Sequence, residues 1–168
     1  MQEQRSMTSR MLGAAFLDIQ TFEEVEHDET ATGQAAAVVA LMAACQAIGG
    51  SGGGLLAAVY AGLAAMASWA VFAGITYLVG EKIFQGEATW GEVLRTLGFA
   101  QAPGILYLLD VIPLFGFFLS LFVSVWVLVA AFVGIRQALD IGNGKTFLTI
   151  LVAGGVYVFL QTFLFLLL

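Results

Sequence analysis

The chain has 168 residues, of which 60% are hydrophobic and only 11% charged, and its formal net charge is −6. Soluble domains carry about 25% charged residues, so these proportions exclude a water-soluble globular protein. The negative charge argues against binding to nucleic acid, because there is no basic stripe to neutralise phosphates. We therefore expect the lipid bilayer to surround most of the chain.

The N-terminal segment, residues 1–30, is polar and acidic and is predicted to remain outside the hydrocarbon. Within it, apolar side chains recur at three- and four-residue spacing with acidic residues between them, namely at Met11, Leu12, Phe16, Ile19 and Phe22. This spacing predicts an amphipathic helix that lies at the membrane interface. The alternative is a frayed polar tail.

Five segments have, or approach, the roughly 20 apolar residues that a membrane-spanning helix needs. In chain order they are Ala31–Ile48, Leu55–Val79, Leu94–Leu109, Leu114–Ile135 and Phe147–Leu168. The third is short and interrupted by polar residues and a proline, so its alternative is a segment that enters the membrane and returns. The sequence predicts an all-α, polytopic membrane helix bundle in which residues 31–168 form five transmembrane helices.

The basic residues favour five spans over four. They are Arg5, Arg10, Lys82, Arg95, Arg136 and Lys145. With five spans all six lie on one side, whereas a returning third segment would divide them four to two. Because basic residues concentrate in cytoplasmic loops, we predict a cytoplasmic N-terminus and an extracytoplasmic C-terminus.

Two connections between the spans have recognisable turn chemistry. Residues 49–54 are almost all glycine and predict a tight turn between the first two spans. Thr89 is followed three residues later by Glu92, which is the pattern of a capping box and predicts that a helix begins at Trp90.

The residues that carry chemistry in enzymes are scarce. The chain has one histidine, and its one cysteine, Cys45, lies in an apolar run where a small buried side chain is expected. No nucleophile–base set can be assembled from these residues, and Gly144-Lys145-Thr146 lacks the earlier glycine of a phosphate-binding loop. We expect neither enzymatic activity nor a cofactor.

An acidic run precedes the first span, with six ionisable groups between Glu23 and Glu29. Carboxylate oxygens suit Mg²⁺ or Ca²⁺. A solvated acidic turn at a helix N-terminus explains the same residues and is the preferred interpretation, so no metal site is predicted.

Seven polar residues are expected to meet at the cytoplasmic level of the membrane, and we call them the polar cluster: Glu26, Asp28, Gln34, Arg95, Gln101, Arg136 and Asp140. Arg95 lies near a helix N-terminus, where the helix dipole disfavours a cation, so we predict an acidic partner for it. Glu26 and Asp28 are the first choices and Asp140 the second, because Arg136 has Asp140 one turn away. The cluster is interpreted as an ion-pair network that holds the bundle together, or alternatively as a site for a lipid headgroup or ligand.

Three segments resemble the prokaryotic branch of the Yip family, the Ypt/Rab-interacting membrane proteins. They are Val25–Ala35, Leu94–Gly104 and Ile135–Asp140. The resemblance implies a five-span fold with a cytoplasmic N-terminus, in a prokaryotic plasma membrane. Eukaryotic relatives bind Rab GTPases through a long N-terminal region, and the segment of about thirty residues here does not carry that role over.

These observations predict a non-enzymatic membrane organiser, adaptor or subunit of a membrane complex. Its expected surroundings are the lipid bilayer and protein partners or a second copy of the chain. The alternative is a small transporter or channel in which the polar cluster binds a cation or a lipid headgroup. Such a transporter would need a continuous polar path, and the last span offers only Tyr157, Gln161 and Thr162 toward one.

Overall fold

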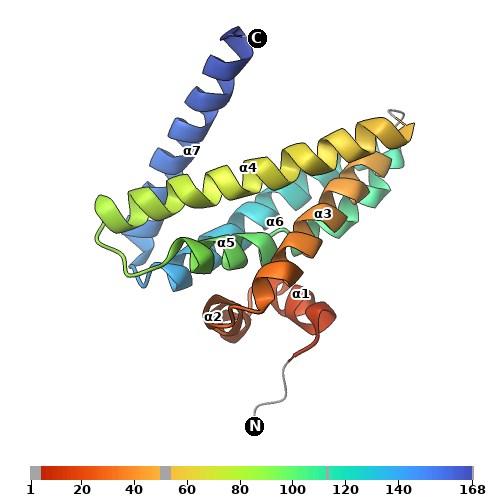
Figure 1. Cartoon of the computed structure of the whole chain (residues 1–168). Coiled ribbons are helices and arrows are strands. Elements are labelled where there is room, and N and C mark those ends of the chain that lie inside the picture. The colour runs from red at the N-terminus through yellow and green to blue at the C-terminus, as the bar shows by residue number, and fades with distance from the viewer. Residues whose placement is uncertain (1–4, 50–53, 113, 168) are drawn as a thin grey trace.

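The computed structural model describes residues 5–49, 54–112 and 114–167, and these residues form helices without a strand (Figure 1). Residues 50–53 of the predicted glycine turn lie outside the described residues, as does Pro113. The elements in chain order are α1 (Met7–Ala15), α2 (Ile19–His27), α3 (Ala31–Gly49), α4 (Gly54–Lys82), α5 (Trp90–Phe99), the 3₁₀ helix η1 (Ala102–Val111), α6 (Phe115–Ala138) and α7 (Asn143–Leu167).

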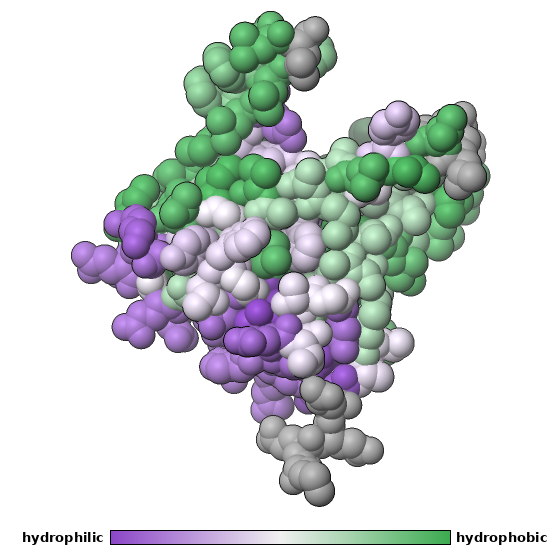
Figure 2. Space-filling model, in the orientation of Figure 1, coloured by the Kyte–Doolittle hydropathy of each residue, from purple (hydrophilic) through white to green (hydrophobic). Residues whose placement is uncertain are grey.

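Four of these helices, α3, α4, α6 and α7, are long and apolar enough to cross a membrane. They correspond to the first, second, fourth and fifth predicted spans. Figure 2 shows hydrophobic side chains over α4 and α7 and hydrophilic ones gathered over the opposite end of the molecule, around α2 and the loop that follows α4. This division is the one expected of a helix bundle in a lipid bilayer.

The third predicted span is not one continuous α-helix. The capping box is present, with the Thr89 hydroxyl accepting from the Glu92 amide and the Glu92 carboxylate accepting from the Thr89 amide, and α5 begins at Trp90 as predicted. The α-helix ends at Phe99, and the chain continues as η1. Pro103, in the first turn of η1, has no amide hydrogen to donate back to the preceding helix, which explains the break.

The segment formed by α5 and η1 lies along α3 and runs in the same direction. A side chain on Gly98 would come within 2.7 Å of the Ala35 Cβ, and one on Gly104 within 3.3 Å of the Met42 sulfur. Further along, the Gly49 Cα faces the main chain of Tyr107. Glycines therefore allow close approach of the two backbones over most of the length of α3.

The predicted single amphipathic helix is instead two helices. Leu17 has a positive φ of 61°, which ends α1, and the Asp18 carboxylate accepts from the Gln20 amide to begin α2. The apolar residues expected on one face therefore separate: Phe22 is fully buried, whereas Phe16 is 76% exposed. The break at Leu17 therefore falls where the spacing of the apolar residues predicted one continuous helix.

The core joins the N-terminal helices to the spans. Phe22 and Val25 of α2 pack in one cluster with Ala35 and Val38 of α3 and Phe99 of α5. At the same end of the molecule, the amide of Glu87 donates to the carbonyl of Leu139 (3.0 Å), which brings together the loop before α5 and the turn before α7. Helix α7 leaves the bundle from this end and diverges from α4 (Figure 1).

Candidate functional site

The most deeply buried charge belongs to Arg10 on α1, whose side chain is 1% exposed. Its Nη2 lies 2.8 Å from the Glu24 carboxylate and 2.6 Å from that of Asp28, and its Nη1 donates to the Gln34 side-chain oxygen at 3.0 Å. We call these four residues the Arg10 network. It connects α1 to α2, to the turn after α2 and to α3.

This role of Arg10 was not predicted from the sequence. A signal was present, because Met7, Arg10, Met11 and Ala14 follow the i, i+3, i+4, i+7 spacing of a buried helix face. Arg10 occupies a position in that stripe where an apolar residue is expected. Its partners are 14 to 24 residues away in the chain, so their identity could not be predicted from local spacing.

Arg95 on α5 is also buried, but the predicted acidic partner is wrong. Its Nε donates to the main-chain carbonyls of Val25 (2.9 Å) and Glu26 (3.1 Å), and its Nη2 also donates to the Glu26 carbonyl. These carbonyls belong to the last turn of α2, where helical partners are lacking. The guanidinium therefore lies at the negative end of the α2 dipole, whereas Arg95 itself is the sixth residue of α5 and lies beyond the first turn, where the dipole of α5 would disfavour a cation.

The carboxylate expected to pair with Arg95, that of Glu26, is 6% exposed and makes no hydrogen bond or ion pair within the part of the chain that the structure describes. Burial first, and then the nearby carboxylates of Asp140, Glu92 and Glu23, raise the pKa of this carboxyl from 4.5 to about 7, although His27 opposes the change. Near neutral pH a substantial fraction of Glu26 is therefore protonated.

The remaining members of the polar cluster lie in three places, namely the Arg10 network, the end of α6 and a cavity between the helices. Asp28 and Gln34 belong to the Arg10 network. The pKa of Asp28 lies below its usual value, first through the hydrogen bond from the Thr30 hydroxyl and then through Arg10. Arg136 donates to the side chains of Gln137 and Asn143 and not to Asp140, because Asp140 follows the end of α6 with a positive φ of 50°.

The acidic run does not assemble as a metal site. Within residues 5–49, 54–112 and 114–167 no three His, Cys, Asp or Glu side chains are grouped so that they could hold an ion. Glu24 and Asp28 instead face Arg10, and Glu23 accepts a hydrogen bond from Gln137 at 3.0 Å.

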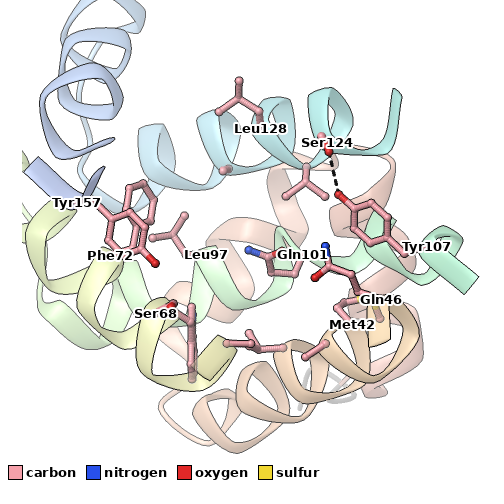
Figure 3. Close-up of a pocket in the computed structure, with 16 residues that line it drawn as sticks. Met42, Gln46, Ser68, Phe72, Leu97, Gln101, Tyr107, Ser124, Leu128 and Tyr157 are labelled. Carbon is pink, nitrogen blue, oxygen red and sulfur yellow. Dashed lines mark hydrogen bonds between the residues drawn. The ribbon is translucent and has the colours of Figure 1, made fainter. Parts of the chain in front are cut away.

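Gln101, the last member of the polar cluster, lies elsewhere, in a cavity of about 410 Å³ between the spans. The wall is formed by residues of α3, α4, α5, η1, α6 and α7, none of which is charged. Its polar side chains are Gln46, Ser68, Gln101, Tyr107, Ser124 and Tyr157. Figure 3 shows the amide groups of Gln46 and Gln101 directed into this space, which we call the membrane cavity.

Two of the polar groups around the membrane cavity satisfy each other. The Tyr107 hydroxyl and the Ser124 hydroxyl are 3.1 Å apart, and Ser124 donates to the carbonyl of Ser120 at 2.7 Å (Figure 3). On the opposite wall, the rings of Phe72 and Tyr157 meet edge to face with centroids 5.7 Å apart. The cavity thus combines aromatic surface with a few hydrogen-bonding groups, as small-molecule sites do.

Comparison with known proteins gives the family to which the chain belongs. No curated protein and no solved structure matches the chain. The Yip1 domain matches residues 16–165, which include α2, all the long apolar helices, both buried contacts of Arg95 and the membrane cavity. The chain therefore belongs to the Yip1-domain family of membrane proteins.

Proposed function

We propose that the chain crosses the membrane five times, with α5 and η1 together as the third span. Ten α-helical and ten 3₁₀ residues extend over about 35 Å, which exceeds the roughly 30 Å of a hydrocarbon core. The parallel course of this segment along α3 supports the same conclusion. A segment that turned back would leave the outer half of α3 without this neighbour.

The proposed orientation has the N-terminus in the cytoplasm and the C-terminus outside, in a prokaryotic plasma membrane. The contacts of α2, of the loop before α5 and of the turn before α7 bring the basic residues to one end of the molecule, and the positive-inside rule makes that end cytoplasmic.

Reporter fusions test this topology. A periplasm-active reporter fused after Leu168 should be active, and so should one inserted after Ser51. A reporter that works only in the cytoplasm should be active when it is inserted after Gln85. Cytoplasmic activity from the Leu168 fusion would contradict the five-span arrangement.

The function that this arrangement supports best is that of a non-catalytic organiser or subunit of a membrane complex, with residues 1–30 as its cytoplasmic segment and residues 31–168 as its membrane domain. The observation that carries this proposal is the use of Arg10 and Arg95 inside the protein. Both arginines fix α1 and α2 to the spans, while Glu23, Glu29 and Glu87 remain exposed at the same end. The result is a rigid, acidic cytoplasmic surface suited to a partner with basic residues.

Purification in mild detergent after cross-linking in cells tests this role. A specific partner should be recovered with the unmodified chain, and its yield should fall several-fold when Glu23, Glu29 and Glu87 are all changed to Gln. The control is Glu81→Gln, which removes a carboxylate already paired with Lys82. Recovery that is equal for both variants would argue against a charged docking surface.

The second candidate is a small transporter or channel, and the membrane cavity is the observation in its favour. The polar cluster gives it less support than the sequence indicated, because Arg95 already bonds to main-chain carbonyls and Asp28 and Gln34 already bond to Arg10. Solute or ion flux into liposomes that contain the purified protein would favour this candidate over the organiser.

A further inference from the structure

The membrane cavity lies deep within the spans. Gln46 is 15 residues beyond the start of α3 and Tyr157 is 14 residues beyond the start of α7, so each is about 21–22 Å along its helix from the cytoplasmic end. In a hydrocarbon core roughly 30 Å thick, these positions are well away from the cytoplasmic headgroups.

Two amides in this cavity lack hydrogen-bond partners in the described structure. Gln46 is exposed on the surface of the helices and Gln101 is half-buried, and their side chains bond to no residue in 5–49, 54–112 or 114–167, although both point into the cavity (Figure 3). An amide without a partner in an apolar medium is unfavourable by roughly 2–7 kcal/mol. Gln161, by contrast, donates to its own helix neighbour Tyr157 at 2.7 Å.

The chemistry of the wall defines what could supply these hydrogen bonds. None of the cavity residues is charged, so an ion or a phosphate would have no countercharge at this depth. A transmembrane helix about 10 Å wide would place only about one turn in 410 Å³, which excludes a partner helix as the occupant of the cavity. The volume falls instead in the range of small-molecule sites.

The route of entry is from the lipid. Ser124 and Leu128, both on α6, line the cavity and are exposed on the surface of the bundle, where acyl chains would contact them. Trp69 and Phe72 on α4 provide an aromatic wall for the apolar part of a ligand.

We propose that the membrane cavity binds an uncharged amphiphile that is dissolved in the bilayer. Hydroxyl or carbonyl groups of its head hydrogen-bond to the amides of Gln46 and Gln101, and its hydrocarbon lies against Trp69 and Phe72. Neutral lipids of the diacylglycerol kind and isoprenoid quinones share this chemistry. The proposal goes beyond the organiser role and requires only that the helices around the cavity lie in the bilayer.

Photo-cross-linking of the full chain in phosphatidylcholine vesicles tests the proposal. Three probes carry the same photoreactive group on a diacylglycerol, on an isoprenoid quinone and on phosphatidic acid. At least one neutral probe should label peptides of α3 and of the α5–η1 segment, and its unlabelled form should compete. Labelling by the diacylglycerol alone, by the quinone alone or by both identifies which source fits the site.

Two variants connect the labelling to the cavity. Changing both Gln46 and Gln101 to Leu should lower the labelling roughly tenfold, as expected when two hydrogen bonds are lost. Ser68→Phe leaves both amides in place and fills the cavity, and should have a similar effect. Thr162→Val removes a polar group of α7 that does not line the cavity and should leave the labelling unchanged.

The proposal is overturned if neither neutral probe labels these peptides, or if phosphatidic acid labels them equally well. It is also overturned if neither cavity variant changes the labelling, which would indicate contact with surface lipid only. Each variant is compared with the unmodified protein by thermal unfolding, and replacing the glutamines by leucine should not lower stability because no internal hydrogen bond is lost. The reporter fusions test the topology independently of the photo-cross-linking. A negative result in one experiment therefore does not imply a negative result in the other.

Discussion

Replacing Arg10 by Ala tests whether the Arg10 network fixes the N-terminal helices to the bundle. The guanidinium is 1% exposed, and the change would leave Asp28 without a cation and Glu24 with only the more exposed Arg5. Breaking a buried ion pair is generally destabilising by about 3–5 kcal/mol. Because these carboxylates are 29% and 16% exposed and keep some access to water, we expect about 3 kcal/mol, near the lower limit.

Unfolding of the purified chain in mild detergent measures this loss, and limited proteolysis should show earlier cleavage between α1 and α2. Arg5→Ala is the matched control, since Arg5 also contacts Glu24, at 3.3 Å, but is 39% exposed and should contribute at most about 1 kcal/mol. Combining Arg10→Ala with Asp28→Asn should be less than additive. A loss no larger than that of Arg5→Ala, or strict additivity, would refute the reasoning.

Three further predictions follow from the same end of the molecule. Arg95→Ala should destabilise by about 2–3 kcal/mol, as expected when hydrogen bonds to a buried charged group are lost, and a double variant with Glu26→Gln should be additive in detergent unfolding, because Arg95 bonds to main-chain carbonyls. Since the pKa of Glu26 is raised from 4.5 to about 7, the folded state holds this proton more tightly than the unfolded state. Stability should therefore fall as pH rises from about 4.5 to 7 and then level off, and the melting temperature of Glu26→Gln should depend less on pH over that window. Thr89→Ala should cost about 1 kcal/mol through loss of the cap of α5, measurable as a lower melting temperature, whereas Thr30→Ala, outside the helices, should leave that cap intact.

The parts of the fold that were predictable from sequence depend on short-range patterns. The long apolar runs predict the four apolar helices because length and hydropathy alone define them. The capping box predicts the start of α5 because its hydrogen bonds join residues three apart. The change to 3₁₀ geometry in the third segment was not predicted, although Pro103 indicated an interruption.

The candidate site was less predictable because its contacts join distant parts of the chain. The polar cluster was expected at one level of the membrane from topology alone, and Asp28, Gln34 and Arg95 do lie around α2. Topology could not predict that Arg95 donates to carbonyl oxygens and not to a carboxylate. That contact depends on whether the carbonyls in the last turn of α2 point toward α5. Topology also predicted that Gln101 would lie with the charged residues, whereas its side chain, in the turn between α5 and η1, points into the membrane cavity (Figure 3).

Val25–Ala35 and Leu94–Gly104 are two of the three segments on which the resemblance to the Yip family was noted. These two segments meet in space: Arg95 bonds to Val25 and Glu26, and Gly98 lies against Ala35. The first contact satisfies the carbonyls at the end of α2, and the second allows α5 to approach α3 closely. These two segments therefore form a joint between α2 and the helices α3 and α5. The joint fixes how these helices pack, without itself supplying reactive groups.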